Sequence, residues 1–431
     1  MTRRWTALAT AALLLAACGS TVGLDKQQAL DGRSDTLGDE EATLGDVDGD
    51  GVAGGVGDAG VDPVGGPSSE EGAVGSSSSG SRSARGGASS AEAQATVAAA
   101  GGRSVGVTDT QILLGVSYAT NGSEANEASG AGAATSTDTR RATELVIKDL
   151  NDRGGIHGRK VVPVWHALDA LAAKTYEQHG QEMCATWTED NKVFAALGAP
   201  YESLRQCMEN AGAPMTYTSL SGSSELTFKE YPLYFEPGNL NLNRIGRHTV
   251  ESLVRRKFFP ANARIGLLTF DDPYFRHAMT QSMHPALARH GLKPTDTVYV
   301  PSPESTSDLG GISAGISSAV LRFRANQVSH VLILDQAAVA TFLFMQEAES
   351  QGFRPRYGLN TQNGNTALSD LLASSGSQDQ LINSLSIGWA PSLDLSEADD
   401  PNDKASPLRR RCLKILEDGG LNSFSSRNAM G

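Results

Sequence analysis

The sequence predicts an α/β fold with two Rossmann-like lobes, each built on a parallel sheet, and a hinge between them. From residue 105 onward, short apolar segments alternate with longer segments whose apolar residues recur at helical spacing. Strands that are separated by helices form parallel sheets with helices on both faces. The chain has more of these units than one small sheet accommodates, and its length exceeds that of one typical domain. Two lobes with a closable cleft between their strand ends follow from this organisation.

The first lobe takes its elements from the N-terminal half of this region. Each expected strand is a run of apolar or β-branched residues, and each expected helix carries an apolar stripe. We expect strands at 112–117, 160–165, 193–197 and 214–218, and helices at 142–151, 174–189 and 203–211, the first of them beginning near Gly130.

The second lobe begins where a strand gives way to a new helical run, at residues 234–239. Its pattern again alternates buried strands with helices, which predicts a second parallel sheet. We expect helices at 246–257, 274–290, 311–325 and 337–351, and strands at 264–270, 297–300, 330–334 and 356–359. After this lobe we expect one more strand at 386–390 and one more helix at 406–418.

One segment, residues 139–165, shows the α/β unit with particular clarity. Ala142, Leu145, Val146 and Leu150 form one apolar stripe. The pair Gly154-Gly155 then ends the helix, because glycine adopts the left-handed cap conformation without a Cβ penalty. A short turn leads into the next strand.

The order of glycines and basic residues in NDRGGIHGRKV, residues 151–161, resembles the first helix–strand connection of type I periplasmic binding proteins, the branched-chain amino acid (Leu/Ile/Val) receptors of ABC importers. The resemblance covers residues 110–428. It implies a first lobe at 105–236 with a return segment at 386–431, a second lobe at 237–370, and three crossings between lobes. Two crossings are expected near Glu236 and 370–386. The third is not visible, so we expect the C-terminus to be incomplete.

The N-terminus resembles a lipoprotein signal. Arg3 and Arg4 precede an apolar run at 5–17 that is too short to span a bilayer, and small residues lead to Cys18. We expect residues 1–18 to act as the signal peptide and Cys18 to carry lipid, anchoring the protein to the outer face of the cytoplasmic membrane. The alternative is an ordinary secretory signal with an incidental cysteine.

The following segment, residues 19–104, is acidic and rich in Gly and Ser. It holds 14 Asp or Glu against five Lys or Arg, within a chain of net charge −13. Such a composition buries too little apolar surface to offset chain entropy, so we expect a disordered tether. The acidic balance gives no indication of nucleic-acid binding.

Three cysteines follow Cys18. Cys184 ends one expected helix and Cys207 lies in the next, and a disulfide between them resembles one in the branched-chain amino acid receptors. An oxidising location favours the bridge over two reduced thiols. Cys412 is then left over. No histidine or other general base is recognisable near it, so a catalytic role is not expected.

In the first lobe, the loop after the strand at 193–197 opens a helix whose free N–H groups favour a carboxylate. Tyr201 is expected to wall the pocket and Glu202 to bind an amine. Ser203 is expected to contact the ligand or, as the alternative, only to cap the helix.

Two further stretches of the first lobe are expected near the opening. By the resemblance, Thr218, Ser219 and Ser221 contact the zwitterion of the ligand; the alternative is a serine-rich surface loop. Tyr118, which follows the first strand with Thr120 and Asn121, is expected to line the opening.

In the second lobe, Tyr274 matches a family position where an aromatic ring closes over the ligand. Asp272, which precedes it, is expected to contact the ligand; the alternative is that it only caps the helix. Asp335 ends the next strand and is expected to reach the ligand. Thr361 is also expected to contact the ligand. The amino acid receptors place an acidic residue at about this position, where this chain has none. Either Glu202 or Asp335 substitutes, or the ligand is not an α-amino acid.

Enzyme classes find little support in the sequence. It has no H-E-x-x-H, P-loop or nucleophile-elbow motif, and its eight histidines form no metal-spaced pair, so we expect neither a metal nor a cofactor. We expect a monomeric receptor that delivers a small polar ligand (an amino acid, amide or related compound) to an ABC permease and ATPase. The alternatives are a ligand sensor for a signalling partner and a decayed, truncated copy that binds nothing.

Overall fold

The computed structural model describes residues 104–122, 124, 138–217, 221–305, 309–395 and 407–421, which all belong to one structural unit. The predicted signal peptide with Cys18 and the tether up to residue 103 lie outside the described residues, as do Thr218 and Ser219. Within the described residues, every helix is too short or too polar to cross a membrane.

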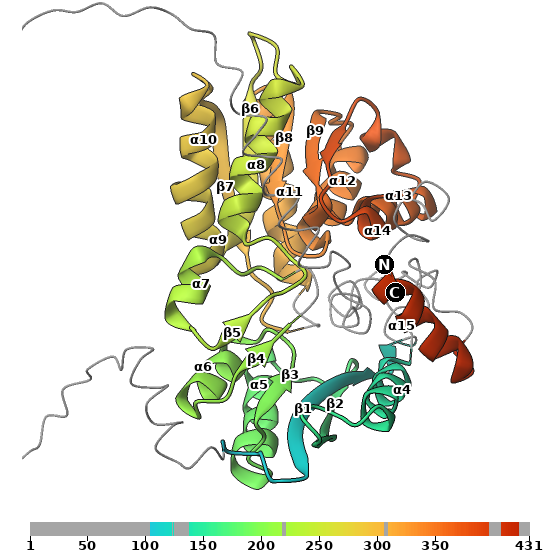
Figure 1. The fold of residues 1–431 in the computed structure, drawn as a ribbon. Coiled ribbons are helices and arrows are strands. Elements are labelled where there is room, and N and C mark those ends of the chain that lie inside the picture. Colours follow the sequence, from blue (N-terminus) through green and yellow to red (C-terminus); the bar gives the residue numbers. More distant parts are fainter. Residues whose placement is uncertain are drawn as a thin grey trace, which may run out of the picture. The chain divides into compact units, whose positions relative to one another are not determined.

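The first sheet is parallel throughout, as predicted (Figure 1). Its strand order is β2-β1-β3-β4-β5, so β1 lies inside the sheet with its register fixed from both sides. Because the strands are parallel, their carboxyl ends meet at one edge, where ligands of open α/β sheets bind. The strands are β1 (Gln111–Thr120), β2 (Lys160–Asp169), β3 (Ala195–Leu197), β4 (Met215–Thr216) and β5 (Tyr234–Phe235).

The helices that accompany this sheet are amphipathic. The predicted helix at 174–189 is α5 followed by a π-helical turn, Ala185–Asp190. The first helix does not begin near Gly130: Asp138 accepts a hydrogen bond from the amide of Arg141 and caps the helix there. The helices are α4 (Thr139–Asp152), α5 (Tyr176–Cys184), α6 (Glu202–Asn210) and α7 (Glu225–Glu230), the last of which the sequence pattern did not predict.

The second sheet is also parallel, in the order β10-β9-β8-β6-β7. All five residues of β8 are buried, which agrees with its continuous apolar sequence HVLIL. The strands are β6 (Ile265–Asp271), β7 (Pro294–Pro301), β8 (His330–Leu334), β9 (Arg356–Asn360) and β10 (Leu385–Ile387).

The helices around the second sheet enclose the larger apolar core. Helix α12 is buried almost all round and packs against α11, and Phe323 and Phe344 meet between these two helices. The predicted helix at 274–290 is interrupted by a π-helical turn, Met279–Met283. The helices are α8 (Leu242–Arg255), α9 (Pro273–Ala278), α10 (His284–Arg289), α11 (Leu309–Ala325), α12 (Val339–Ser350), α13 (Asn365–Ser374) and α14 (Pro391–Asp394).

The return to the first lobe starts later than the predicted residue 386. Strand β10 pairs with β9, Leu385 opposite Gly358, and so belongs to the second sheet. The physical reason is that the short connection after α13 brings this strand to the open edge of β9. Helix α15 (Pro407–Asp418) instead packs on α4 of the first lobe, as Figure 1 shows.

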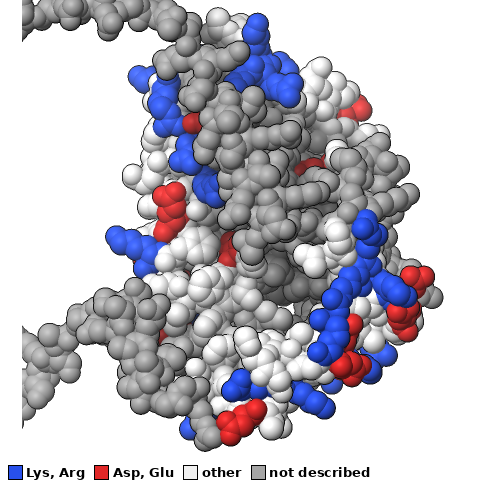
Figure 2. Space-filling model, in the orientation of Figure 1, with Lys and Arg blue, Asp and Glu red and all other residues white. Residues whose placement is uncertain are grey.

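The contact between α15 and α4 combines an apolar centre with an ion pair. Leu416 is fully buried against Ala142 and Leu145. Arg411 Nη2 lies 2.9 Å from Asp149 Oδ2. Figure 2 shows basic and acidic side chains side by side over this part of the surface, which is consistent with paired charges there.

The turn after α4 explains the glycines in the segment at 151–161. Gly155 has φ +69°, and a Cβ on it would lie 1.9 Å from the carbonyl oxygen of Arg159. The side chain of Asn151 then bonds both the amide and the carbonyl of Val161, at 2.8 Å each. The end of the helix is thereby tied to the start of β2.

Candidate functional site

A cavity of about 640 Å³ lies where elements that follow both sheets meet. Its walls come from the start of α5, the start of α6, the segment after β4, the start of α9 and the segments after β7 and β8. Five of the residues that the sequence predicted as ligand contacts line this cavity: Tyr201, Glu202, Ser203, Asp272 and Tyr274.

One wall of the cavity is an aromatic stack. The rings of Tyr176 and Tyr201 lie nearly parallel with centroids 5.1 Å apart, and His179 follows at 6.2 Å from Tyr201. Burial raises the pKa of Tyr201 well above its usual value, so its hydroxyl stays protonated at neutral pH. The rings of Tyr176 and Tyr201 thus supply an aromatic part of the cavity wall.

Arg205 also lines the cavity, although the sequence pattern did not predict this. Only 8% of it is exposed, and its guanidinium lies over the rings of Tyr231, Tyr234 and Tyr274 at 5.5, 5.4 and 5.4 Å from their centroids. It donates to the carbonyl of Pro200, while Nε is buried without a hydrogen-bond partner in the described part of the chain. The feature of the sequence that could have indicated its burial is its position beside Leu204 and Met208, on the buried face of α6.

Two carboxylates and two phenols form a cluster beside Arg205. Tyr274 Oη lies 3.2 Å from Glu202 Oε1 and 3.0 Å from Glu230 Oε2. Tyr231 Oη lies 3.4 Å from the same oxygen of Glu202. Burial raises the pKa of Tyr274 far above its ordinary value, so its hydroxyl is a permanent donor.

Asp272 performs the helix-capping role that the sequence left as an alternative, and it lines the cavity as well. Its Oδ1 accepts from the amides of Tyr274 and Phe275 at 2.8 and 3.4 Å. Burial raises the pKa of this carboxyl. Oδ2 makes no hydrogen bond within the described residues.

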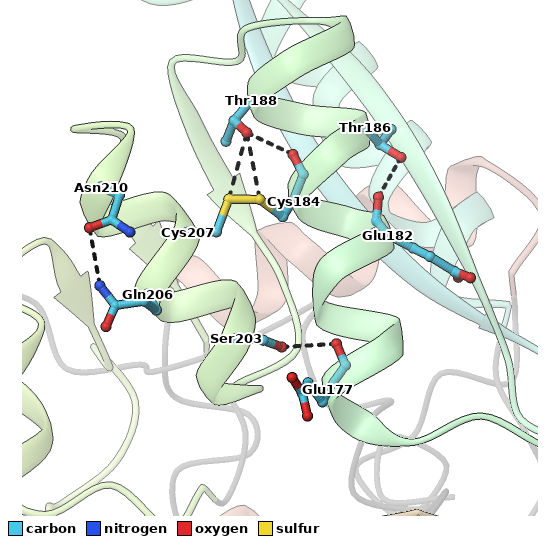
Figure 3. Close-up of a disulfide and its surroundings, with 9 residues drawn as sticks. All are labelled: Glu177, Glu182, Cys184, Thr186, Thr188, Ser203, Gln206, Cys207 and Asn210. Atoms are coloured by element: carbon cyan, nitrogen blue, oxygen red, sulfur yellow. Dashed lines mark hydrogen bonds between the residues drawn. A yellow bond between two sulfur atoms is a disulfide. The ribbon is translucent and has the colours of Figure 1, made fainter.

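Ser203 does not cap α6, because the N-cap position is Tyr201 and the Ser203 hydroxyl donates to the carbonyl of Glu177 in α5 at 3.1 Å (Figure 3). The two helices approach closely here: a Cβ on Gly180 would lie 2.0 Å from Ser203 Oγ. Farther along, Cys184 and Cys207 form a disulfide with Cα atoms 5.9 Å apart. These contacts fix the start of α6 beside the cavity. Cys412 is not a free thiol either.

Tyr118 is not among the residues that line the cavity. Its hydroxyl accepts from Arg140 Nη1 at 3.0 Å, and its ring meets the edge of Trp165 at 5.8 Å. Asn121 Nδ2 donates to Asp169 Oδ1 at 2.9 Å. These side chains tie the ends of β1 and β2 together.

Asp335 was predicted to reach the ligand, but the structure gives it a different role. It is fully buried, and its oxygens accept from the amides of Gln336, Ala340 and Thr341 and from the Thr341 hydroxyl. Burial raises its pKa to about 6. The carboxylate holds the start of α12, because the orphan amides of a helix N-terminus need acceptors.

Thr361 and Ser221 are likewise buried outside the cavity lining. Thr361 Oγ1 donates to Asp394 Oδ2 at 2.7 Å and accepts from the amide of Trp389. Ser221 donates to Glu236 Oε1, and its carbonyl accepts from Gln362 Nε2 of the second lobe. Ser221 thus lies at the predicted crossing between the lobes.

Glu236 is the centre of that crossing. Its Oε1 accepts from Ser223 Oγ at 2.5 Å and from Tyr234 Oη at 2.6 Å, in addition to Ser221. Its Oε2 is buried without a partner in the described residues, and burial raises the pKa of the carboxyl. Three hydroxyl donors on one carboxylate hold the first segment between the lobes in place.

The charge of the cavity lining is predominantly acidic. Among the described lining residues, Arg205 is the one basic residue, and its guanidinium already makes cation–π contacts with three tyrosine rings. The acidic lining residues are Glu177, Glu202, Asp272 and Glu304. The local field therefore favours a ligand with at least one positively charged group. Among the residues that the structure describes, no group of His, Cys, Asp or Glu could hold a metal ion.

A family profile described as "Periplasmic binding protein" matches residues 125–403. A search of curated proteins finds no significant match. Among solved structures, an extracellular ligand-binding receptor from Verminephrobacter eiseniae shares 14% identity, covers 74% of this chain and 81% of its own, and has a TM-score of 0.51.

Two further structures show weaker similarity. A possible leucine/isoleucine/valine-binding protein from Rhodopirellula baltica has 14% identity, coverage of 74% and 78%, and a TM-score of 0.49. The branched-chain amino acid transporter substrate-binding protein LivJ from Streptococcus pneumoniae, in complex with isoleucine, has 13% identity, coverage of 74% and 87%, and a TM-score of 0.45.

The receptor from Verminephrobacter eiseniae shows the fold alone, because its identity is low. The family profile shows more than the fold, because it spans well over half of the sequence and includes almost every element of both sheets. This chain belongs to the periplasmic binding protein family.

Proposed function

We propose that the protein is an extracytoplasmic solute-binding receptor of an ABC importer. It captures a small polar ligand, an amino acid, an amide or a related compound, between its two lobes. The observation that carries this proposal is the cavity of about 640 Å³ whose aromatic and charged walls come from elements of both sheets. A cavity of this kind, with a few polar groups among aromatic walls, is typical of small-molecule sites.

The residues at the start of α6 and α9 supply the recognition groups. The first amides of α6 suit a carboxylate or carbonyl oxygen of the ligand, and Tyr201 and Tyr274 supply walls. Because Asp335 is buried as a helix cap, Glu202 and Asp272 are the acidic residues that we assign to a ligand amine. Thr218 and Ser219, carried over by the family resemblance, complete the proposed set.

The protein acts by binding and hinge closure, without covalent chemistry. Its family is one of binding proteins, which supports this reading. Delivery then requires a permease and a separate ATPase as partners, and the receptor acts as a monomer held to the membrane by lipid on Cys18. Mass analysis of the mature N-terminus checks the anchor: an unmodified residue other than Cys18 at the start would contradict it.

The test of the receptor function is a ligand screen of the protein by thermal shift, followed by calorimetric titration. Binding raises the melting temperature as RT ln(1 + [L]/Kd), which amounts to several degrees at saturating ligand. We expect a shift with one class among amino acids, amides and small organic acids. A cooperative melt that none of these compounds shifts would contradict the proposal.

A matched pair of variants assigns the shift to the cavity. For a ligand with an amine, Glu202→Gln should weaken binding by about tenfold or more, because a charge-assisted hydrogen bond is lost. Glu225→Gln, an exposed residue of α7 outside the cavity lining, should bind as the unmodified protein does. Equal losses in both variants would argue against a role for Glu202.

A further inference from the structure

Tyr274 is a residue of the second lobe whose side chain is buried in the first. It starts α9, directly after β6 of the second sheet, and only 5% of it is exposed. Its ring belongs to the apolar cluster of the first lobe, together with Met208, Tyr217 and Tyr231. The surrounding socket is therefore made by the other lobe.

The socket contacts both the ring and the hydroxyl of Tyr274. Arg205 of α6 lies over the ring, 5.4 Å from its centroid, and so makes a cation–π contact between the lobes. The hydroxyl lies within 3.2 Å of Glu202 Oε1 and 3.0 Å of Glu230 Oε2, which come from α6 and α7. The hydroxyl has one proton, so it donates to one of the two carboxylates at a time. The other carboxylate still lies within hydrogen-bond distance of the same hydroxyl.

The backbone before Tyr274 holds the ring in position. Asp272 accepts from the amide of Tyr274 at 2.8 Å, and Pro273 fixes φ at the first helical position. The tyrosine therefore projects from a rigid helix start and loses little freedom when it enters the socket.

We propose that Tyr274 is the clasp between the two lobes, and that the cavity opens only when its side chain leaves the socket formed by Glu202, Arg205, Glu230 and Tyr231. The proposal rests on the proposed function in treating separation of the lobes as the opening step. In this proposal, contacts between the protein's own residues hold the lobes closed. Glu230 and Arg205 are positioning residues, and a ligand does not have to touch them.

A second contact between the lobes provides a reporter. The amide of Tyr176 in the first lobe donates to the carbonyl of Glu304 in the second at 2.8 Å, and Thr175 pairs with Ser305. Hydrogen exchange at this amide requires the lobes to separate or the local strand pair to break. The amides of β8 lie deep in the second core and exchange only when that lobe unfolds.

The experiment is hydrogen–deuterium exchange on the full chain without ligand, comparing Tyr274→Phe, Tyr274→Ala and a control, Tyr299→Phe. Tyr299 lies in β7 under Arg276, outside the cavity lining. We expect exchange at the Tyr176 amide to rise about tenfold in Tyr274→Phe, the factor that corresponds to one hydrogen bond to a charged group. The rise should be larger in Tyr274→Ala and absent in Tyr299→Phe, with the β8 amides unchanged.

Unchanged exchange at Tyr176 in both Tyr274 variants would overturn the clasp. If β8 exchange also rises in Tyr274→Ala, that variant has unfolded and Tyr274→Phe decides alone. Since no ligand is present, the exchange result is independent of the ligand screen: a screen without a hit would count against the receptor function and leave the clasp standing.

Discussion

Buried charge in the described part of this protein is held by specific partners. Arg205 lies over three tyrosine rings, Asp335 accepts four hydrogen bonds at the start of α12, and Glu236 accepts three hydroxyls at the lobe crossing. Buried ionised groups without partners would each cost several kcal/mol. Asp335 shows the consequence most clearly, because burial still raises its pKa to about 6 in spite of its donors.

This pKa predicts a pH dependence of stability. Between about pH 4 and 6 the folded protein keeps a proton on Asp335 that the unfolded chain has released, so the contribution of Asp335 to stability falls as pH rises through this window. The free energy of unfolding relative to Asp335→Asn should fall by up to about 3 kcal/mol between these values.

Urea unfolding of both proteins at pH 4, 5, 6 and 7 measures this difference. The exposed Asp190→Asn serves as the control and should show no comparable trend. A difference between the unmodified protein and Asp335→Asn that stays constant over this range would show that burial does not raise the pKa of Asp335.

At the level of helices and strands, a few positions where chain segments approach each other closely determine how the elements pack. Gly180 lets α5 and α6 meet beside the disulfide, and Gly155 lets the end of α4 turn into β2. At Gly155 two constraints coincide: a positive φ of 69° and a carbonyl oxygen 1.9 Å from any Cβ. Gly212, which follows α6, has nearly the same φ of 67° but nothing within 4 Å.

Comparing the two glycines therefore distinguishes the cost of a positive φ from the cost of a steric clash. Gly212→Ala should cost about 1 kcal/mol, since only the left-handed conformation is penalised. Gly155→Ala should cost roughly 2–4 kcal/mol, because the backbone must also move. Thermal or urea unfolding measures both, and equal losses would mean that the turn after α4 relaxes freely.

At the scale of the whole described chain, segments far apart in sequence complete the first lobe. Helix α15, near residue 410, covers α4, near residue 145, through Leu416. The second lobe in turn sends Tyr274 into the first. The first lobe is thus not built from one continuous stretch, and changes in α15 should alter its stability.

Leu416→Ala should destabilise the first lobe by about 2–4 kcal/mol, the usual range for truncating a buried leucine. Leu408→Ala in the same helix is the matched control, because Leu408 is 59% exposed, and should change stability by less than about 0.5 kcal/mol. Protease accessibility of α4 in native buffer locates the effect. An equal, small response to both changes would show that α15 contributes little to the first lobe.

The sequence alone predicts the fold class and most strand positions, because these depend on local apolar periodicity and on glycines such as Gly155. It also brought Tyr201, Glu202, Ser203, Asp272 and Tyr274 to one cavity, since the residues after parallel strands share an edge.

The directions of side chains and the pairing of chain segments far apart in sequence can be seen only in the folded chain. Asp335 follows its strand as a ligand contact would, yet its carboxylate turns back onto the amides of α12. In the sequence, Arg205 is one charged residue of a predicted helix. In the structure, its guanidinium lies over three tyrosine rings from other segments. β10 joined the second sheet because β9 offered an open edge. Pattern along the chain fixes which face a residue occupies, but the partner on that face comes from elsewhere in the sequence.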